Sequence, residues 1–453
     1  MYMKERLRDI GFHKIIVTIL ISLVFVVLII IGDYGLAGDS KSYLSLNIYR
    51  EPVYTIIVCI MQSIFGAEHF YMPLAILQNV IAALSCIGLV YTVNRYILKD
   101  RLSLYIEAFL SVIPHLMTPI FSRSHLVLTN KIMEEAVTFS EYYLLMIFVI
   151  KVIYDTSCRR RNILLMSLVT SLLILTRGQM SITAIGIAIL LIIIAIREQS
   201  VRPALQSVVI MVAIFIGTMI ITRSYNYLVS GRFIGTVSGK TTFATNVIYV
   251  SGMQDGISVE DDKLRMLYDK LMSALDEDKL LYEYAEGGVL SKAIYHESCH
   301  DTIKYDYFEP VKNEVYNGLM GDNYIDYQIV QDEIAGELTG VLLPGCIGRF
   351  VTNYCCMCVL GLVRTVAVEK SVLWIIAVLV YMVYLVLLIQ SFRKNGWTEE
   401  NVLGVFVLIM VLGFVCGTSL YIMCLSRYVI YNLPFVYFMI YTLFRKNREI
   451  GVK

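Results

Sequence analysis

The sequence predicts an all-α polytopic membrane protein with about ten membrane-spanning helices. Hydrophobic residues make up 57% of the 453 residues and charged residues only 17%, whereas soluble domains are about 45–50% apolar with about a quarter charged. Several apolar runs also approach the roughly 20 residues that a helix needs to cross a bilayer. The net charge of +1 gives no indication of a nucleic-acid partner.

The first apolar run, residues 15–31, follows a short basic segment that ends at Lys14. No small-residue cleavage site follows the run, so we expect a retained span rather than a cleaved signal peptide. Because positive charges favour the cytoplasmic side, the N-terminus is expected inside the cell and the next loop, residues 32–71, outside.

This outer loop interrupts the apolar N-terminal third with Asp33, Asp39 and Arg50. Residues 53–65 within it are apolar but too short to cross the bilayer comfortably, so we expect a helix that lies at the outer interface. Pro52 suits the first turn of that helix, because its missing N–H is one that the helix cannot pair.

Six further apolar runs lie between the loop and residue 222, and basic clusters orient them. The strongest cytoplasmic signal is Arg159 with Arg160 and Arg161, and a tight hairpin then places Arg177 outside. The runs are residues 72–93, 102–121, 135–154, 163–176, 180–196 and 204–222.

Hydrophobicity falls from residue 223 to about residue 340, where we expect a mainly helical extracytoplasmic insert. Between Ser251 and Gly340 there are 20 Asp and Glu against 7 Lys and Arg, and acidic residues resist translocation little. Residues 341–370 are ambiguous. If they crossed the membrane, the basic C-terminal tail would lie outside, so we expect an interfacial helix there.

The last spans are then residues 371–391, 401–423 and 428–444, with both termini cytoplasmic. The expected organisation is a transmembrane module (1–222) with a catalytic outer loop (32–71), the insert (223–340), the interfacial helix (341–370) and C-terminal transmembrane helices (371–453).

This topology gathers charged residues from distant parts of the chain at the outer membrane face. Charged groups at membrane depth are unfavourable, and by default they indicate function. The set comprises Asp33, Asp39, Arg50, Arg123, His125, Lys131, Glu134, Glu135, Arg177 and Arg427.

Asp39 and Asp33 are the candidate catalytic residues. A half-buried carboxylate at the membrane boundary can act as the general base for an acceptor hydroxyl. The alternative is a structural role, because Asp39-Ser40 ahead of Tyr43 would also cap an interfacial helix well.

Glu134 and Glu135 open the run at residues 135–154. They could contact an acceptor or a divalent cation, or only favour a helix N-terminus through its dipole. Arg177 and Arg427 could bind a phosphate through parallel hydrogen bonds, or extend to the interface as isolated charges. A further cationic cluster consists of Arg123, His125 and Lys131.

The cysteine and histidine spacing favours no metal site. Cys355, Cys356 and Cys358 lack a second ligand pair at zinc spacing, so packing is the favoured interpretation. His296 and His300 are four residues apart, but the sequence between them is not the HExxH pattern of zinc proteases. The sequence also contains no Walker loop, no GxSxG and no internal repeat.

Short motifs follow one another in a definite order. They are an acidic outer loop with a tyrosine, a proline–aromatic start to an interfacial helix, a Tyr-x-x-x-Arg span end, a Glu-led span, a Thr-Arg hairpin and a late Arg-Tyr. In this chain they read Gly38-Asp39-Ser40-Lys41-Ser42-Tyr43-Leu44, Arg50-Glu51-Pro52-Val53-Tyr54 to Ile64-Phe65-Gly66, Tyr91-Thr92-Val93-Asn94-Arg95, Ile132-Met133-Glu134-Glu135, Thr176-Arg177-Gly178, and Ser426-Arg427-Tyr428 with Pro434.

In this order the motifs resemble the GT-C superfamily of membrane glycosyltransferases. The likeness is to the branch that includes protein O-mannosyltransferases and the bacterial lipid A aminoarabinose transferase. Glu51-Pro52 stands where the family commonly has Pro-Pro, and Gly178 stands where a proline is usual.

The resemblance implies transfer of a sugar from a polyprenyl-phosphate carrier to a lipid, glycan or protein acceptor on the outer face. Asp39 would deprotonate the acceptor hydroxyl, which would attack the anomeric carbon with inversion. Arg177 and Arg427 would stabilise the leaving phosphate where its charge develops, with Arg123 and Lys131 as further phosphate ligands. The substrate-lining residues would be Tyr43, Arg50, Tyr54, His125 and Tyr428.

Two other function classes stay open. A polysaccharide transporter usually shows internal repeats and broken helices at the membrane midplane, and the sequence shows no repeat. A polysaccharide ligase or polymerase would place its largest polar loop late, as this chain does with residues 223–340. The transferase hypothesis requires Asp39, Glu134, Arg177 and Arg427 to lie together. A scatter on the order of 25 Å, the length of a helix of about 17 residues, would oppose it.

Overall fold

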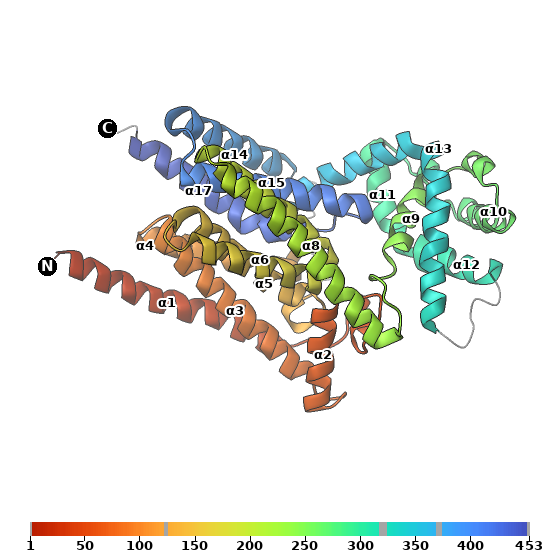
Figure 1. Ribbon diagram of the computed structural model, residues 1–453, viewed down its shortest axis with the longest axis horizontal. Coiled ribbons are helices and arrows are strands. Elements are labelled where there is room, and N and C mark those ends of the chain that lie inside the picture. The colour runs from red at the N-terminus through yellow and green to blue at the C-terminus, as the bar shows by residue number, and fades with distance from the viewer. Residues whose placement is uncertain (1, 122–125, 317–323, 368–373, 451–453) are drawn as a thin grey trace. The chain divides into compact units, whose positions relative to one another are not determined.

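The computed structural model describes residues 2–121, 126–316, 324–367 and 374–450. Within these ranges the chain is helical apart from its connections (Figure 1), as the sequence predicts. The chain divides into two compact units. Unit 1 is Met1–Tyr225, Leu362–Phe414 and Ser426–Lys453, and unit 2 is Asn226–Gly361 with Val415–Leu425.

Among the described residues, eight helices are long and apolar enough to cross a membrane, so the chain is a multi-pass membrane protein. Seven of them coincide with predicted spans. The predicted spans at residues 102–121, 163–176 and 428–444 are also helical, but their described residues do not meet the same combined criterion of length, hydropathy and charge. The eight segments are Gly11–Ile31, Tyr71–Tyr96, Glu135–Tyr154, Gly178–Arg197, Val201–Ser230, Ile325–Ala367, Trp374–Asn395 and Glu399–Tyr421.

Helix α13 (Tyr324–Ala367) differs from the prediction. The segment expected as a separate interfacial helix, residues 341–370, is the C-terminal part of this longer helix as far as Ala367. The polar residues that suggested a break have partners, because Arg349 forms an ion pair with Asp255 and Asn353 contacts His296 at 3.0 Å. Pro344 also lies within the continuous helix.

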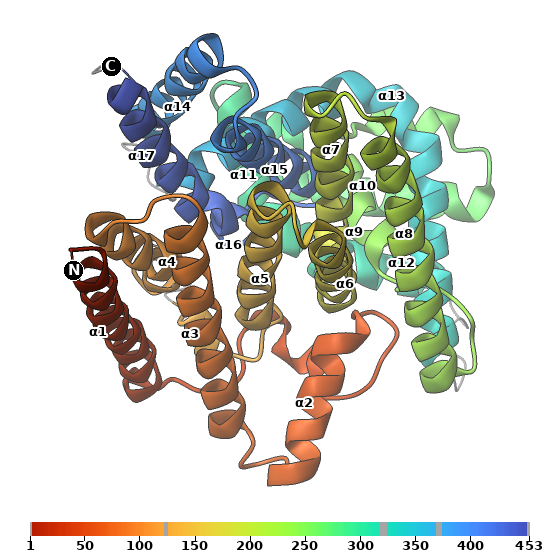
Figure 2. The ribbon, with the colours of Figure 1, turned by 60° about the vertical axis from the view of Figure 1, so that its left-hand side comes forward.

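Unit 1 is organised around helix α5, Glu135–Tyr154, whose ends match the predicted span. Its side chains are buried on all sides, and it packs between α3 and α6 (Figure 2). In contrast, α1, α8 and α14 keep most of their apolar side chains exposed, as helices that face lipid do. The helices of this unit are α1 (Tyr2–Ile31), α2 (Pro52–Phe65), α3 (Tyr71–Tyr96), α4 (Arg101–Phe121), α5, α6 (Arg159–Thr176), α7 (Ile182–Arg197), most of α8 (Val201–Ser230), α14 (Trp374–Asn395), most of α15 (Glu399–Tyr421), α16 (Ser426–Val429) and α17 (Leu433–Ile450).

The loop after α1 is folded against the N-terminal end of α5. Backbone pairing joins Gly35 to the segment at Lys131, with the N–H of Ile132 donating to the carbonyl of Gly35 at 3.2 Å. A buried apolar cluster that includes Tyr43, Tyr54 and Phe70 lies beneath the loop. Helix α2 begins at Pro52, as predicted from the missing N–H of proline.

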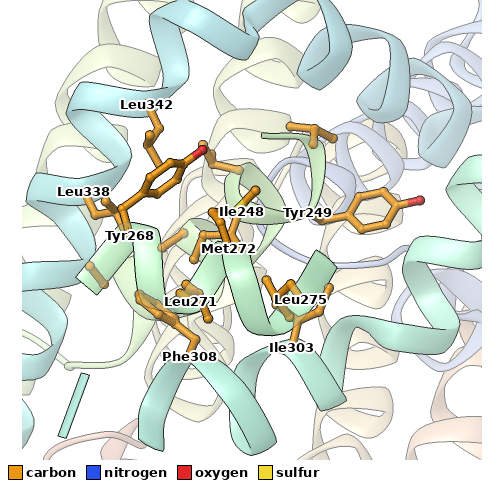
Figure 3. Packing of buried hydrophobic residues seen from close by; sticks show 14 of the residues in the cluster. Ile248, Tyr249, Tyr268, Leu271, Met272, Leu275, Ile303, Phe308, Leu338 and Leu342 are labelled. Carbon is orange, nitrogen blue, oxygen red and sulfur yellow. The ribbon is translucent and has the colours of Figure 1, made fainter. Parts of the chain in front are cut away.

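Unit 2 has its own apolar core, and its described residues are mainly helical, as expected for the insert. Helix α10 (Asp262–Glu277) presents apolar side chains at three- and four-residue spacing, and the side chain of Asp261 caps it at 2.8 Å from the N–H of Leu264. Figure 3 shows these side chains packed against α9 (Gly239–Val250), the π-helical turn Thr302–Phe308 and α13. The remaining helices of the unit are α11 (Val289–Asp301) and α12 (Glu309–Val315).

Lys312 of α12 is a buried charge in this unit, and Lys312→Met is expected to stabilise the protein near pH 7. The ammonium is inaccessible, lies 4.3 Å from the ring centre of Phe308 and donates to the carbonyl of Gln331 at 3.3 Å. Burial lowers the pKa of Lys312 from 10.5 to about 8. Near pH 7 the native state therefore holds an unfavourable charge, which the uncharged methionine removes at a gain on the order of 3 kcal/mol.

The sign of the pH dependence follows from the lowered pKa. Between about pH 8 and pH 10.5 the unfolded chain binds more protons at Lys312 than the native protein, so the wild type becomes more stable as pH rises through this window. Thermal unfolding of the purified full-length protein near both limits should show this rise, and Lys312→Met should lack it. The exposed Lys263 provides the control as Lys263→Met. Equal behaviour of the two variants would contradict the prediction.

Candidate functional site

Two adjacent carboxylates lie at the N-terminal end of α5. Glu134 is the residue before the helix and Glu135 its first residue, and their side chains are only 12% and 5% exposed. The dipole of α5 favours negative charge there. Two buried carboxylates side by side still require positive partners, because an unpaired buried charge is strongly destabilising.

Arg177 supplies the first of these partners. It follows the last residue of α6, and its backbone N–H donates to the carbonyl of Leu173 at 2.9 Å. This hydrogen bond fixes the backbone position from which the Arg177 side chain extends. The guanidinium then bridges the two glutamates, with Nε 3.2 Å from Oε1 of Glu134 and Nη1 3.1 Å from Oε1 of Glu135. It also lies over the ring of Tyr428, 4.7 Å from the ring centre.

Arg427, at the start of α16, approaches the same pair from the C-terminal part of the chain. Its Nε lies 3.6 Å from Oε1 of Glu135, and its Nη2 donates to the hydroxyl of Tyr428 at 2.8 Å. Arg427 is 4.9 Å from the centre of the Tyr428 ring, so Arg177 and Arg427 both contact one aromatic side chain.

The loop after α1 reaches the pair through Tyr43. Its hydroxyl donates to Oε2 of Glu134 at 2.6 Å, and its ring contacts Tyr54 edge-on at 5.1 Å. The guanidinium of Arg50 lies 4.7 Å from the centre of the Tyr43 ring and 3.4 Å from Oδ1 of Asp39. One continuous chain of contacts therefore joins Asp39, Arg50, Tyr43, Glu134, Arg177, Glu135, Arg427 and Tyr428.

The surroundings of Tyr43 keep its hydroxyl group protonated, so that this neutral group acts as a hydrogen-bond donor. Burial, and next the negative charge of Glu134, raise the pKa of the Tyr43 hydroxyl well above its ordinary value. Burial also raises the pKa of the Glu134 carboxyl, while the charges of Arg177 and Arg50 act in the opposite direction. The three carboxylates and three guanidinium groups alternate along the chain of contacts, so the site is close to neutral as a whole.

Asp39 is the accessible carboxylate of this set. Its side chain is 44% exposed, whereas Glu134 and Glu135 are enclosed by arginine and tyrosine. The capping role considered for Asp39 does not occur. The N-cap position of this helical turn is Ala37 rather than Asp39, and the hydroxyl of Ser40 accepts from the N–H of Ala37 at 2.6 Å. Asp39 is therefore placed to meet a molecule that comes from outside the site.

The other predicted residues lie elsewhere or have other partners. Asp33 forms an ion pair with Lys131, with Oδ1 2.9 Å from Nζ, beside the backbone bridge at Gly35. Arg123 and His125 lie outside the described residues. The hydroxyl of Tyr54 donates to Oε1 of Gln78 at 2.8 Å, so Tyr54 supports the site through its ring edge rather than its hydroxyl.

Two features of the site were not predicted. Tyr431, three residues after Tyr428, accepts from Nη1 of Arg177 at 3.4 Å, and the late Arg-Tyr motif with its helical spacing was the available signal. Gly178 stands directly against Glu51, where an added Cβ would lie 3.2 Å from Oε1.

The described residues bring no three metal-ligating side chains together, and the carboxylates of the site face guanidinium groups. His296 and His300 are buried in unit 2. His296 stacks on Tyr249 with ring centres 4.1 Å apart, and Nδ1 of His300 lies 3.0 Å from Asp301.

No protein-family model matches the sequence, and no curated protein matches it. Two crystal structures of ArnT from Cupriavidus metallidurans are similar, each at 14% identity. The apo structure aligns with a TM-score of 0.34, over 92% of this chain and 76% of that chain. The structure bound to undecaprenyl phosphate aligns with a TM-score of 0.36, over 89% of this chain and 77% of that chain.

Proposed function

We propose that this chain is a GT-C-type membrane glycosyltransferase that moves a sugar from a polyprenyl-phosphate carrier to a lipid, glycan or protein acceptor on the outer membrane face. The observation that carries the proposal is the chain of contacts from Asp39 to Arg427. It joins an accessible carboxylate to two arginines that come from opposite ends of the sequence. These are the residues on which the sequence resemblance to GT-C enzymes depends.

Asp39 is proposed as the general base. Arg50 holds Oδ1 at 3.4 Å, and the half-exposed carboxylate can accept a proton from an acceptor hydroxyl. As the proton passes to Asp39, the hydroxyl oxygen forms a bond to the anomeric carbon of the donor. The bond from that carbon to the phosphate oxygen breaks, and the polyprenyl phosphate leaves with the electron pair. Attack from the side opposite the phosphate inverts the anomeric configuration.

The two arginines are proposed to act differently. Arg177 is 8% exposed and is held by both glutamates, so it positions the carboxylates rather than meeting the donor. Arg427 is 26% exposed and has a longer ion pair of 3.6 Å with Glu135, which leaves more of its guanidinium available. Arg427 is therefore the residue proposed to contact the leaving phosphate, where negative charge develops.

A polysaccharide ligase or polymerase would use the same donor chemistry and would differ in the acceptor. Deletion of the gene, followed by mass spectrometry of surface glycans and of polyprenyl-linked sugars, tests the proposal in the cell. We expect one glycan structure to disappear and its polyprenyl-phosphate sugar to accumulate, with both effects reversed by the wild-type gene. An unchanged glycan profile together with an unchanged donor pool would contradict the proposal.

A further inference from the structure

The opposite end of α5 forms a second polar site, which the proposed sugar transfer does not use. The C-terminal ends of α3 and α5 and the start of α6 enclose a pocket of about 580 Å³. The 20 residues of α5 separate this pocket from Glu135 by roughly 30 Å, the thickness of the hydrocarbon core of a bilayer. Its volume lies in the range of small-ligand sites.

Three cations from three different helices line the pocket. They are Arg95 of α3, Lys151 of α5 and Arg161 of α6. Across the part of the chain that the structure describes, none of them forms an ion pair with a carboxylate within 4.0 Å. The three cations outnumber the one carboxylate of the lining, so the pocket carries a net positive charge.

The single carboxylate in the lining belongs to Asp155, and it accepts hydrogen bonds from the turn between α5 and α6. Its Oδ1 accepts from the hydroxyl of Ser157 at 2.6 Å and from the N–H of Cys158 at 3.2 Å, and its Oδ2 accepts from the hydroxyl of Tyr96 at 3.4 Å. These hydrogen bonds hold the carboxylate in the turn and explain why it does not pair with the nearby cations.

Two further polar groups of the lining are unsatisfied. The side-chain nitrogen of Asn162 and the hydroxyl of Tyr154 are buried and have no hydrogen-bond partner among the described residues. A buried donor without a partner in the protein can donate to an acceptor that enters the pocket. The positive-inside bias alone would place cations at this membrane side, but it requires neither a shared pocket nor buried donors beside it.

We propose that the pocket formed by Arg95, Lys151, Arg161, Tyr154 and Asn162 binds the phosphate group of an anionic ligand at the membrane surface. Phosphate oxygens accept hydrogen bonds from guanidinium, ammonium, amide and hydroxyl donors, which are the groups the pocket offers. The phosphate comes either from an anionic lipid head group or from a soluble phosphate ester.

Native mass spectrometry of the purified full-length protein in detergent tests the proposal. The probes are phosphatidylglycerol, phosphatidic acid, zwitterionic phosphatidylcholine and soluble glycerol phosphate. The test variant is Arg95→Gln/Lys151→Gln/Arg161→Gln. We expect it to bind the two anionic lipids more weakly than the wild type, on the order of tenfold or more. If the triple variant does not fold, Arg161→Gln at the exposed side of the pocket serves in its place.

The matched control removes three exposed cations that are expected on the same membrane side but do not line this pocket: Lys99→Gln/Arg393→Gln/Lys394→Gln. It should keep wild-type binding. Anionic lipid that glycerol phosphate does not displace identifies a head-group site, and displacement by glycerol phosphate identifies a soluble phosphate ester. Equal losses in the two triple variants, or phosphatidylcholine binding as tightly as phosphatidylglycerol, would overturn the proposal.

Discussion

Arg177→Met is expected to destabilise the protein by about 3–5 kcal/mol, because removing one partner of a buried ion pair leaves the other charge uncompensated. In this site two carboxylates would lose their positively charged partner, because the guanidinium of Arg177 bridges Glu134 at 3.2 Å and Glu135 at 3.1 Å. The other arginine nearby, Arg427, reaches Glu135 only at 3.6 Å and cannot replace both contacts. Thermal unfolding of the detergent-solubilised protein, followed by size-exclusion chromatography, measures the effect.

The control variants separate lost charge compensation from lost packing. Arg160→Met removes an exposed arginine of α6 and should change stability by less than about 0.5 kcal/mol. Adding Glu134→Gln and Glu135→Gln to Arg177→Met removes the uncompensated charges, so this triple variant should regain most of the lost stability. A variant Arg177→Met that unfolds at the wild-type temperature would show that the two glutamates are not held as charged groups.

Asp39→Asn is expected to lower the rate of sugar transfer by about 10²–10⁴-fold, the usual contribution of a general base. The amide keeps the size of the side chain but cannot accept the acceptor's proton. Stability should change little, because the ion pair of Asp39 with Arg50 is partly exposed and such pairs contribute about 0–1 kcal/mol. The rate constant at saturating donor, measured beside an unfolding curve, distinguishes the two effects.

Asp33→Asn is the matched control for this experiment. Asp33 lies on the same loop and is also paired with a cation, Lys131, but it is outside the chain of contacts that reaches Arg427. We expect Asp33→Asn to retain most of the activity. Loss of transfer in Asp33→Asn with full transfer in Asp39→Asn would assign the base to Asp33 and contradict the proposed mechanism.

The membrane helices were predictable because their signal is local. Helix α5 begins and ends at the predicted residues, and α2 begins at Pro52, since apolar length and the missing proline N–H act within one segment. Helix α13 was not predicted as one helix. Its polar residues looked like interruptions, whereas Asp255 and His296, far away in sequence, provide their partners.

The sequence predicted which residues belong to the site, but it did not predict which of them form ion pairs with one another. Charge and apolar length indicate the membrane side of a residue, but they do not give the direction of its side chain around a helix. The sequence therefore grouped Arg177 with the phosphate ligands, while the structure places it between two buried glutamates. The involvement of Tyr431 and the contact between Gly178 and Glu51 depend on the same tertiary packing.

The most direct measurement is sugar transfer by the purified wild-type protein in liposomes. The donor is a polyprenyl-phosphate sugar labelled in the sugar, and the acceptor is envelope material from the deletion strain. We expect the label to pass to the acceptor with inversion at the anomeric carbon, and free polyprenyl phosphate to form in equal amount. With Asp39→Asn we expect the label to stay on the donor. Label that stays on the donor with the wild-type protein as well, or passes equally fast with Asp39→Asn, would contradict the proposed function.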